Sequence, residues 1–177
     1  MSEKINEKGL VVHTSGSVPL NVLSKHARRG VFYPLQTFTA GKILNFKEIP
    51  LCLEVNNEKD SQLLLSLAKK LSDNVQIVDS EKRKILHVAA VFVNNFTNYM
   101  YSMGNQICED NNIDFSMLFP LIQETAAKIE IMSPKKAQTG PAKRQDLKTL
   151  HGHLQLLKDE KHKAIYTLLS NAIKEEG

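Results

Sequence analysis

The first 79 residues alternate short apolar runs with turn residues and amphipathic segments. The apolar runs have the length and the flanking residues of β-strands, and they cover residues 10–13, 30–34, 50–55 and 75–79. Two intervening segments, residues 18–29 and 57–71, carry apolar side chains at helical spacing. Strands separated by helices predict an open α/β sheet, and four short strands make it a thin one.

The periodicity changes at residue 80, beyond which no strand pattern occurs. Apolar spacing predicts helices over residues 80–109, 114–132, 146–157 and 161–174, with a loop over residues 133–145. Ser80 or Asp79 for the first of these helices, and Asp114 and Asp146 for two later ones, stand where helix N-caps are needed. We therefore expect an α/β segment over residues 1–79 and an all-α domain over residues 80–177.

The predicted helix over residues 80–109 is apolar on nearly all sides in its middle. A helix of this kind must be buried on most of its surface. A chain of 177 residues can hardly bury it alone. We therefore expect a homodimer that packs through the long helix near residues 80–109.

A polar line runs through this apolar helix. At 100° per residue, His87, Asn94 and Asn98 lie within about 60° of one another. Buried amides need hydrogen-bond partners, because each unpaired one costs about 1–3 kcal/mol. The line either bonds to neighbouring helices at a dimer seam or forms a wall that faces a substrate or cofactor, and the sequence leaves both interpretations open.

The C-terminal half offers a second group of candidates. Glu124 and Lys128 have the spacing of an exposed ion pair on one helix turn. Gln138, Thr139 and Arg144 lie in a glycine-containing loop before a helix start, and these are the parts of an anion-binding site. The alternative is a basic loop followed by a capped helix.

Charge and composition narrow the function classes. The net charge of +4 divides evenly, with 10 basic and 8 acidic residues up to Asp79 and 13 and 11 beyond it, so we expect no nucleic-acid partner. The two cysteines and six histidines show no metal-ligand spacing, and we expect no metal. No apolar run approaches the ~18 residues that span a bilayer, and the first residues are polar. We expect a cytoplasmic protein without membrane attachment.

Several long stretches together resemble one family. They are residues 13–17, 33–38, 86–98, 120–125 and 138–146. On them the chain resembles the family that pairs a Rossmann-like domain with an uncharacterised all-α C-terminal domain, related to pyrroline-5-carboxylate, deazaflavin-dependent and beta-hydroxyacid reductases. The resemblance implies the C-terminal part of a Rossmann-like sheet, followed by a helical domain of the 6-phosphogluconate-dehydrogenase C-terminal type. It also implies NADP or NAD as cofactor.

The resemblance assigns roles to the candidate residues. Those that would contact the cofactor are His13, Thr14, Ser15, Gly16 and Gln36. Those that would orient a small carbonyl or imine substrate as catalytic residues are His87, Asn94 and Asn98. Those that would bind the substrate further are Glu124, Lys128, Gln138, Thr139 and Arg144.

The sequence departs from the family pattern in three ways. No Gly-rich phosphate-binding turn occurs, so we expect a truncated chain that begins after that turn. The lysine typical of beta-hydroxyacid dehydrogenases, four residues before an asparagine, is replaced by Ala90 or Val91. His87 could replace it as proton donor, because imidazole ordinarily titrates near pH 6.5. Tyr33 stands where the family motif commonly has histidine, and a phenol is a poor base at pH 7.

Two functions therefore follow from the sequence. The first is an NAD(P)-dependent oxidoreductase that reduces a small carbonyl or imine substrate and is not competent as this chain alone. The alternative is a non-catalytic dimerising or ligand-binding module, which the missing turn and the missing lysine favour.

Overall fold

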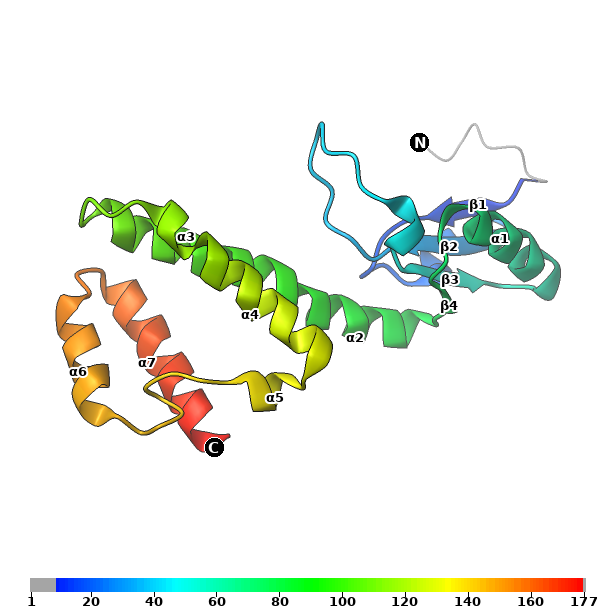
Figure 1. Cartoon of the computed structure of the whole chain (residues 1–177). Helices are drawn as coiled ribbons and strands as arrows, with labels where there is room; N and C mark the ends of the chain where they lie inside the picture. The colour runs from blue at the N-terminus through cyan, green and yellow to red at the C-terminus, as the bar shows by residue number, and fades with distance from the viewer. Residues whose placement is uncertain (1–8, 177) are drawn as a thin grey trace. The chain divides into compact units, whose positions relative to one another are not determined.

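The computed structural model describes residues 9–176 (Figure 1). The chain divides into two compact units, one of the described residues up to Asn98 and one from Tyr99 onward. The elements change from α/β to all-α at Ser80, where the first long helix begins. The predicted α/β character of the first part is confirmed, whereas the predicted domain boundary after Asp79 stays a prediction.

The sheet contains four strands side by side in chain order. They are β1 (Val11–His13), β2 (Arg29–Pro34), β3 (Leu51–Val55) and β4 (Val75–Ile77). The outer pairs β1–β2 and β3–β4 are parallel, whereas β2 and β3 are antiparallel. The connection between β2 and β3 holds only the short 3₁₀ helix η3 (Phe46–Glu48) and returns the chain in the opposite direction. The sheet is therefore mixed.

The two faces of the sheet differ: one packs against the apolar core, and the other carries polar side chains. On one face, β3 and helix α1 (Glu58–Leu71) form the apolar core, which consists of Ile49, Leu51, Leu53, Leu64 and Ala68. On β2 and β3 the register pairs Val31 with Glu54 and Tyr33 with Cys52, and opposed residues of an antiparallel pair share a face. The second face therefore carries Tyr33 and Glu54 together, away from the apolar core.

The predicted helix over residues 18–29 is wrong. Only residues Leu20–Leu23 form a 3₁₀ helix, η2. The sheet takes up the backbone after it, because Val11 N–H donates to the carbonyl of Arg28 at 3.0 Å and Arg29 pairs with Val11. The Arg28 guanidinium meets the Asp60 carboxylate of α1 at 2.6 Å. Long-range bonds thus override the local helical spacing.

The predicted helix over residues 80–109 is present as three consecutive segments. They are α2 (Ser80–Ala90), the π-helix η4 (Val91–Phe96) and α3 (Thr97–Glu109). The wider turn of a π-helix frees carbonyl groups. Thr97 Oγ1 donates to the carbonyl of Phe92 at 3.3 Å and satisfies one of them.

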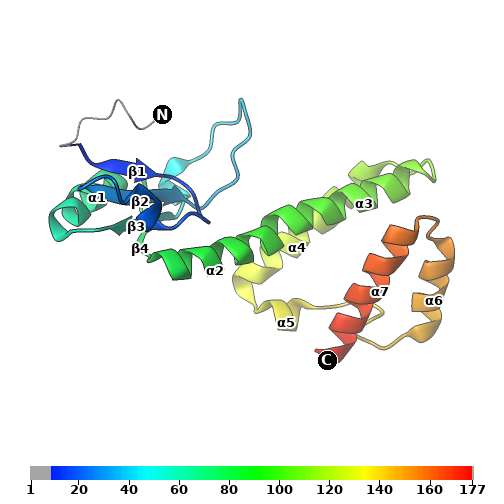
Figure 2. The same ribbon diagram turned by 180° about the vertical axis from the view of Figure 1, so that it is seen from behind.

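The second unit is all-helical (Figure 2). After α3 it contains η5 (Phe115–Leu118), α4 (Phe119–Ile131), α5 (Pro134–Ala137), α6 (Leu147–Leu156) and α7 (Glu160–Glu175). The predicted caps are confirmed, since the carboxylates of Asp79, Asp114 and Asp146 accept backbone N–H groups at helix starts. The short α5 lies inside the predicted loop. Among residues 9–176, none of the helices combines the length and the hydropathy that crossing a bilayer requires.

Asp60 links stability to pH. Its side chain is 1% exposed, and bonds from Arg28 and then from Asn57 hold the pKa of the carboxyl below its ordinary value. A lowered folded-state pKa gives stability that is present above the unfolded pKa and is lost as the pH falls through the folded pKa. We expect wild-type chain to lose this stability below about pH 4.

Asp60→Asn should lower the urea midpoint at pH 7 and flatten its decline in acid. Urea unfolding between pH 7 and pH 2.5 measures both effects. Asp73→Asn is the control, because Asp73 is exposed and pairs with Lys47 only at the surface. Equal acid profiles for Asp60→Asn and wild type would contradict the assignment.

Candidate functional site

A tyrosine and a histidine meet above the second face of the sheet. Tyr33 Oη lies 3.3 Å from His87 Nδ1, and the two rings stand edge to face with centroids 6.2 Å apart. Tyr33 comes from the end of β2, and His87 comes from α2, one turn after Arg83. The pair joins residues that are 54 positions apart in sequence.

Gly16 fits closely beneath this pair. It is buried in the turn after β1. A Cβ atom at Gly16 would lie 2.7 Å from His87 Nδ1 and 2.7 Å from Tyr33 Cζ. Real Cβ atoms do not approach other atoms so closely, so the turn needs glycine here if both rings are to keep their positions. Of the predicted cofactor residues, Gly16 thus contacts the Tyr33–His87 pair.

Burial favours the protonated form of Tyr33 further. Desolvation raises the pKa of the phenol above its ordinary value, the Cys52 thiol on the opposing strand adds to this, and the Arg83 charge opposes it. The phenol therefore keeps its proton at neutral pH. A hydroxyl can both donate and accept, so Tyr33 can bond to His87 Nδ1 in either protonation state of the imidazole.

A cavity of about 560 Å³ opens beside the pair, within the first unit. Its wall is largely apolar, with Leu35, Phe38 and Val91 among the lining residues. Its polar groups, apart from the pair itself, are Gln36, Thr37, Asn94 and Asn95. A few polar groups in an apolar wall are typical of a small-molecule site.

Three of the predicted site residues share this cavity, namely Gln36, His87 and Asn94. Both cavity asparagines lie on the π-helix η4, a geometry that is frequent at functional sites. Asn98 lies after η4 and does not line the cavity.

The end of β1 and the turn after it hold the remaining predicted cofactor residues. His13 Nδ1 accepts the N–H of Ser15 at 3.3 Å, and Ser15 Oγ accepts the N–H of Val18 at 3.2 Å. Burial, and then the nearby Arg83 charge, lower the pKa of His13. The imidazole is therefore neutral at pH 7. Thr14 is exposed between them.

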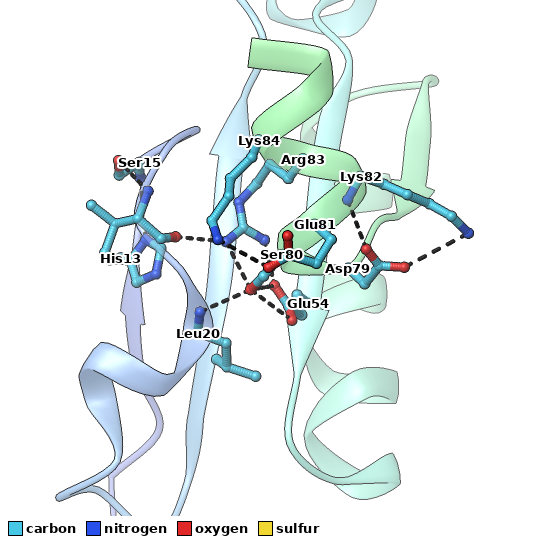
Figure 3. Close-up of polar contacts among 11 residues, drawn as sticks. His13, Ser15, Leu20, Glu54, Asp79, Ser80, Glu81, Lys82, Arg83 and Lys84 are labelled. Carbon is cyan, nitrogen blue, oxygen red and sulfur yellow. Dashed lines mark hydrogen bonds and ion pairs between the residues drawn. The ribbon is translucent and has the colours of Figure 1, made fainter. Parts of the chain in front are cut away.

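A buried ion pair, which sequence reasoning missed, lies on the same face of the sheet (Figure 3). Arg83 of α2 donates to the Glu54 carboxylate of β3, and its side chain is 0% exposed. Ser80 Oγ donates to the same carboxylate at 2.8 Å and accepts the N–H of Leu20 at 2.9 Å. Arg83 and His87 are four residues apart, but only burial distinguishes this arginine from the exposed charges beside it.

The predicted substrate-binding residues lie in the second unit. Lys128 Nζ and Glu124 Oε1 are 3.9 Å apart, an ordinary surface pair within α4. Gln138 Nε2 donates to the carbonyl of Thr139 at 2.8 Å. Their role in substrate binding stays a prediction.

The α6 end of the predicted anion loop is occupied by a carboxylate. Asp146 accepts the N–H of Thr149 at 3.1 Å and its hydroxyl at 2.7 Å, and these bonds lower the pKa of Asp146. A negative charge at this helix end disfavours a second anion there. Anion binding by this loop therefore depends on side chains such as the exposed Arg144.

The second unit has a cavity of its own, of about 370 Å³. Met100, Met103, Leu150 and Ile165 supply much of its apolar wall, and Thr139 also lines it. His153 Nδ1 and Tyr166 Oη, both in the lining, lie 2.8 Å apart. Among the described residues, no three His, Cys, Asp or Glu side chains gather as metal ligands.

The tight fit of Gly16 gives a direct test of the site geometry. Gly16→Ala should separate the Tyr33 and His87 rings and destabilise the chain by about 1–3 kcal/mol through overpacking. NMR of the histidine side chains and urea unfolding measure the two effects. Gly152→Ala is the matched control, since nothing lies within 4 Å of a Cβ there. An undisturbed His87 signal in Gly16→Ala would refute the contact.

Comparisons with known proteins agree with this architecture. The family described as "Domain of unknown function (DUF2520)" matches residues 49–173. Among solved structures, the "putative NADP oxidoreductase BF3122" from Bacteroides fragilis is 44% identical, with a TM-score of 0.93. The match covers 98% of this chain and 68% of that chain. The search of curated proteins found no match.

A second solved structure, protein TM1727 from Thermotoga maritima, is 23% identical with a TM-score of 0.77, over 94% of this chain and 68% of that chain. At this identity the likeness shows the fold alone. The resemblance to a Rossmann-like oxidoreductase family is confirmed at this general level. By the match over residues 49–173, the chain belongs to the DUF2520 family.

Proposed function

We propose that the chain acts in an NADP-linked oxidoreductase that reduces a small carbonyl or imine substrate. The observation that carries the proposal is the Tyr33–His87 pair at 3.3 Å beside a cavity of about 560 Å³. The name of the Bacteroides fragilis protein, 44% identical, supports an oxidoreductase role and NADP as the cofactor.

The residues present fit the nicotinamide side of such a cofactor. His13 Nε2 is buried without a hydrogen bond of full geometry among the described residues, and the backbone of Pro19 acts on its ring and raises its pKa, so an incoming polar group would replace that contact. The amide of Gln36 lies at the cavity. The Gly-rich turn that binds dinucleotide phosphates does not occur in the 177 residues. We therefore propose no role for these residues in binding the cofactor phosphates. When bound, the cofactor supplies the hydride.

His87 supplies the proton that balances the hydride. As imidazolium it donates Nδ1–H to the Tyr33 oxygen and keeps Nε2–H for the substrate oxygen or nitrogen. After the transfer, His87 is neutral with its remaining proton on Nδ1, which still donates to the Tyr33 oxygen. The ring therefore keeps its orientation through the step, while the apolar wall limits water and Asn94 orients the substrate.

Three finer assignments belong to the same proposal. Thr14, Ser15 and Gly16 border the cofactor, Asn98 assists at the substrate, and residues of the second unit are further substrate-binding residues. The last set consists of Glu124, Lys128, Gln138, Thr139 and Arg144.

Substitution of the pair tests the proposed chemistry. His87→Gln should lower kcat by about 10²–10⁴-fold, the usual contribution of a general acid, with little change in NADPH binding. Tyr33→Phe should lower kcat less, because it removes only the partner that orients the ring. NADPH consumption with a panel of carbonyl and imine compounds measures turnover, on the chain and on any longer form of its reading frame. His151→Gln is the control, because His151 is exposed on α6.

Unchanged turnover in His87→Gln would reject His87 as the acid. Absence of NADPH binding in every form would reject the oxidoreductase proposal and favour a non-catalytic module.

One observation favours the dimerising module as a second function, compatible with the first. Apolar side chains of α2 and η4 are exposed in the chain by itself, among them Ile85, Val88, Phe92, Val93 and Phe96. Phe92 is 62% and Val93 73% exposed. Exposed apolar surface of this extent is typical of an interface. We propose that a second copy of the chain covers it.

A charged residue in this surface should separate the dimer. Phe92→Glu should make the chain monomeric, because each buried phenylalanine contributes about 1.5–3 kcal/mol, at least ten-fold in Kd. Sedimentation equilibrium over a concentration series measures the association. Ile43→Glu is the control, since Ile43 is 97% exposed in a loop. Monomeric wild-type chain at all concentrations would exclude the interface.

A further inference from the structure

We propose that Glu54, Ser80 and Arg83 form a positioning clamp that sets the geometry of the Tyr33–His87 pair. In this proposal Arg83 is a positioning residue of the reaction. The inference rests on the proposed function for its chemical meaning, whereas the geometry it invokes can be measured without any turnover.

The clamp ties three segments of the first unit together (Figure 3). Arg83 donates through Nη1 to Glu54, and through Nη2 to the carbonyl of Val18 at 2.7 Å. Ser80 Oγ donates to Glu54 and accepts the N–H of Leu20. Arg83 Nη2 also reaches Ser80 Oγ at 3.3 Å. Strand β3, the segment around η2 and the first turn of α2 are thereby fixed to one another.

The same segments carry the candidate site. His87 follows Arg83 by four residues on α2 and therefore lies on the same side of that helix. Gly16 precedes Val18 by two residues in the turn. Tyr33 pairs with Cys52, so it lies diagonally across from Glu54 on one face of the sheet. A shift of α2, the turn or β3 would change the contact of the two rings.

The site tolerates little displacement. A Cβ at Gly16 would already meet both rings at 2.7 Å, so the turn and the rings are in close contact without one. A small rotation of α2 would press His87 toward the turn or take it away from Tyr33. The clamp is therefore the contact that keeps the 3.3 Å bond in place.

Stability alone does not account for a buried arginine here. Replacing a buried ion pair with well-packed apolar residues is often neutral or stabilising, because desolvation offsets the attraction. Arg83 Nε is also buried without a hydrogen-bond partner among the described residues, which adds to the cost. The ion pair and its hydrogen bonds instead hold three segments of the first unit in fixed positions relative to one another.

The charge of Arg83 also reaches the titratable groups around it. It lowers the pKa of His13 and acts in the same direction on Tyr33 and Cys52, while Glu54 opposes it at His13. These charged and titratable groups come from β1, β2 and β3. Removing the charge of Arg83 should therefore raise the pKa of His13. A substitution that only left a cavity elsewhere in the chain would not change this pKa.

The test uses the full chain with ¹⁵N-labelled histidine and compares Arg83→Met, Arg83→Lys and Glu54→Gln. In Arg83→Met, the two ring nitrogens of His87 should move toward the averaged signals of a free imidazole. The pKa of His13 should rise in the same variant. Arg83→Lys keeps the charge and should restore the His13 titration, while it recovers the His87 signals only in part. Where turnover is measurable, Arg83→Met should lower kcat by about 10²-fold with little change in KM.

Arg28→Met is the matched control. It removes another arginine that pairs with a buried carboxylate of the first unit, that of Asp60. It should reduce stability while the signals of His87 and His13 stay as in wild type.

The outcomes separate the two proposals. Altered His87 signals in Arg83→Met, with none in Arg28→Met, support the clamp even if no variant and no wild-type chain shows turnover, a result that would reject the proposed function alone. Wild-type His87 signals in folded Arg83→Met overturn the clamp. If Arg83→Met does not fold, Arg83→Lys and Glu54→Gln decide in the same way: altered His87 signals support the clamp, and unaltered signals overturn it.

Discussion

The carboxylate of Glu54 lies on the sheet face opposite the apolar core. The residues that neutralise it also fix the position of the candidate site. A carboxylate that is largely withdrawn from water, as Glu54 is with 17% of its side chain exposed, needs a cation or hydrogen-bond donors to offset its desolvation. Here Arg83 and Ser80 supply them, and both belong to the first turns of α2. The helix must therefore start at a fixed place against β3. Asp79 caps that start by accepting the N–H of Lys82 at 2.8 Å.

Local features of this fold can be predicted from sequence, and long-range ones cannot. The strands follow from short apolar runs between turn residues. The caps at Asp114 and Asp146 follow from side-chain chemistry within a few residues. The segment 18–29 has the same helical spacing as true helices, yet its backbone bonds to β1 and its Arg28 to Asp60. The antiparallel pairing of β2 with β3 likewise depends on a loop whose path has no simple pattern.

The polar line on the long helix shows how a regular geometry can mislead in detail. At 100° per residue, His87, Asn94 and Asn98 share a side, and Asn95 lies at its edge. The structure instead places both Asn94 and Asn95 at the cavity, and Asn98 is outside the lining. In the π-helix η4 each residue turns the chain by less than in an α-helix, so the phase of the side chains shifts. No residue type in this segment marks such a turn in advance.

Tyr33 shows that a substitution in a motif can change the role of a position without removing its contribution. A histidine at this position would add a second titratable base beside His87. The phenol, whose pKa is raised by burial, stays neutral and accepts Nδ1–H of its partner both before and after the proton transfer. The charge in the cavity then changes only at His87, and its apolar wall need not accommodate a second ionised ring. A single acid held by a neutral partner is an arrangement that suits proton delivery to a carbonyl or imine.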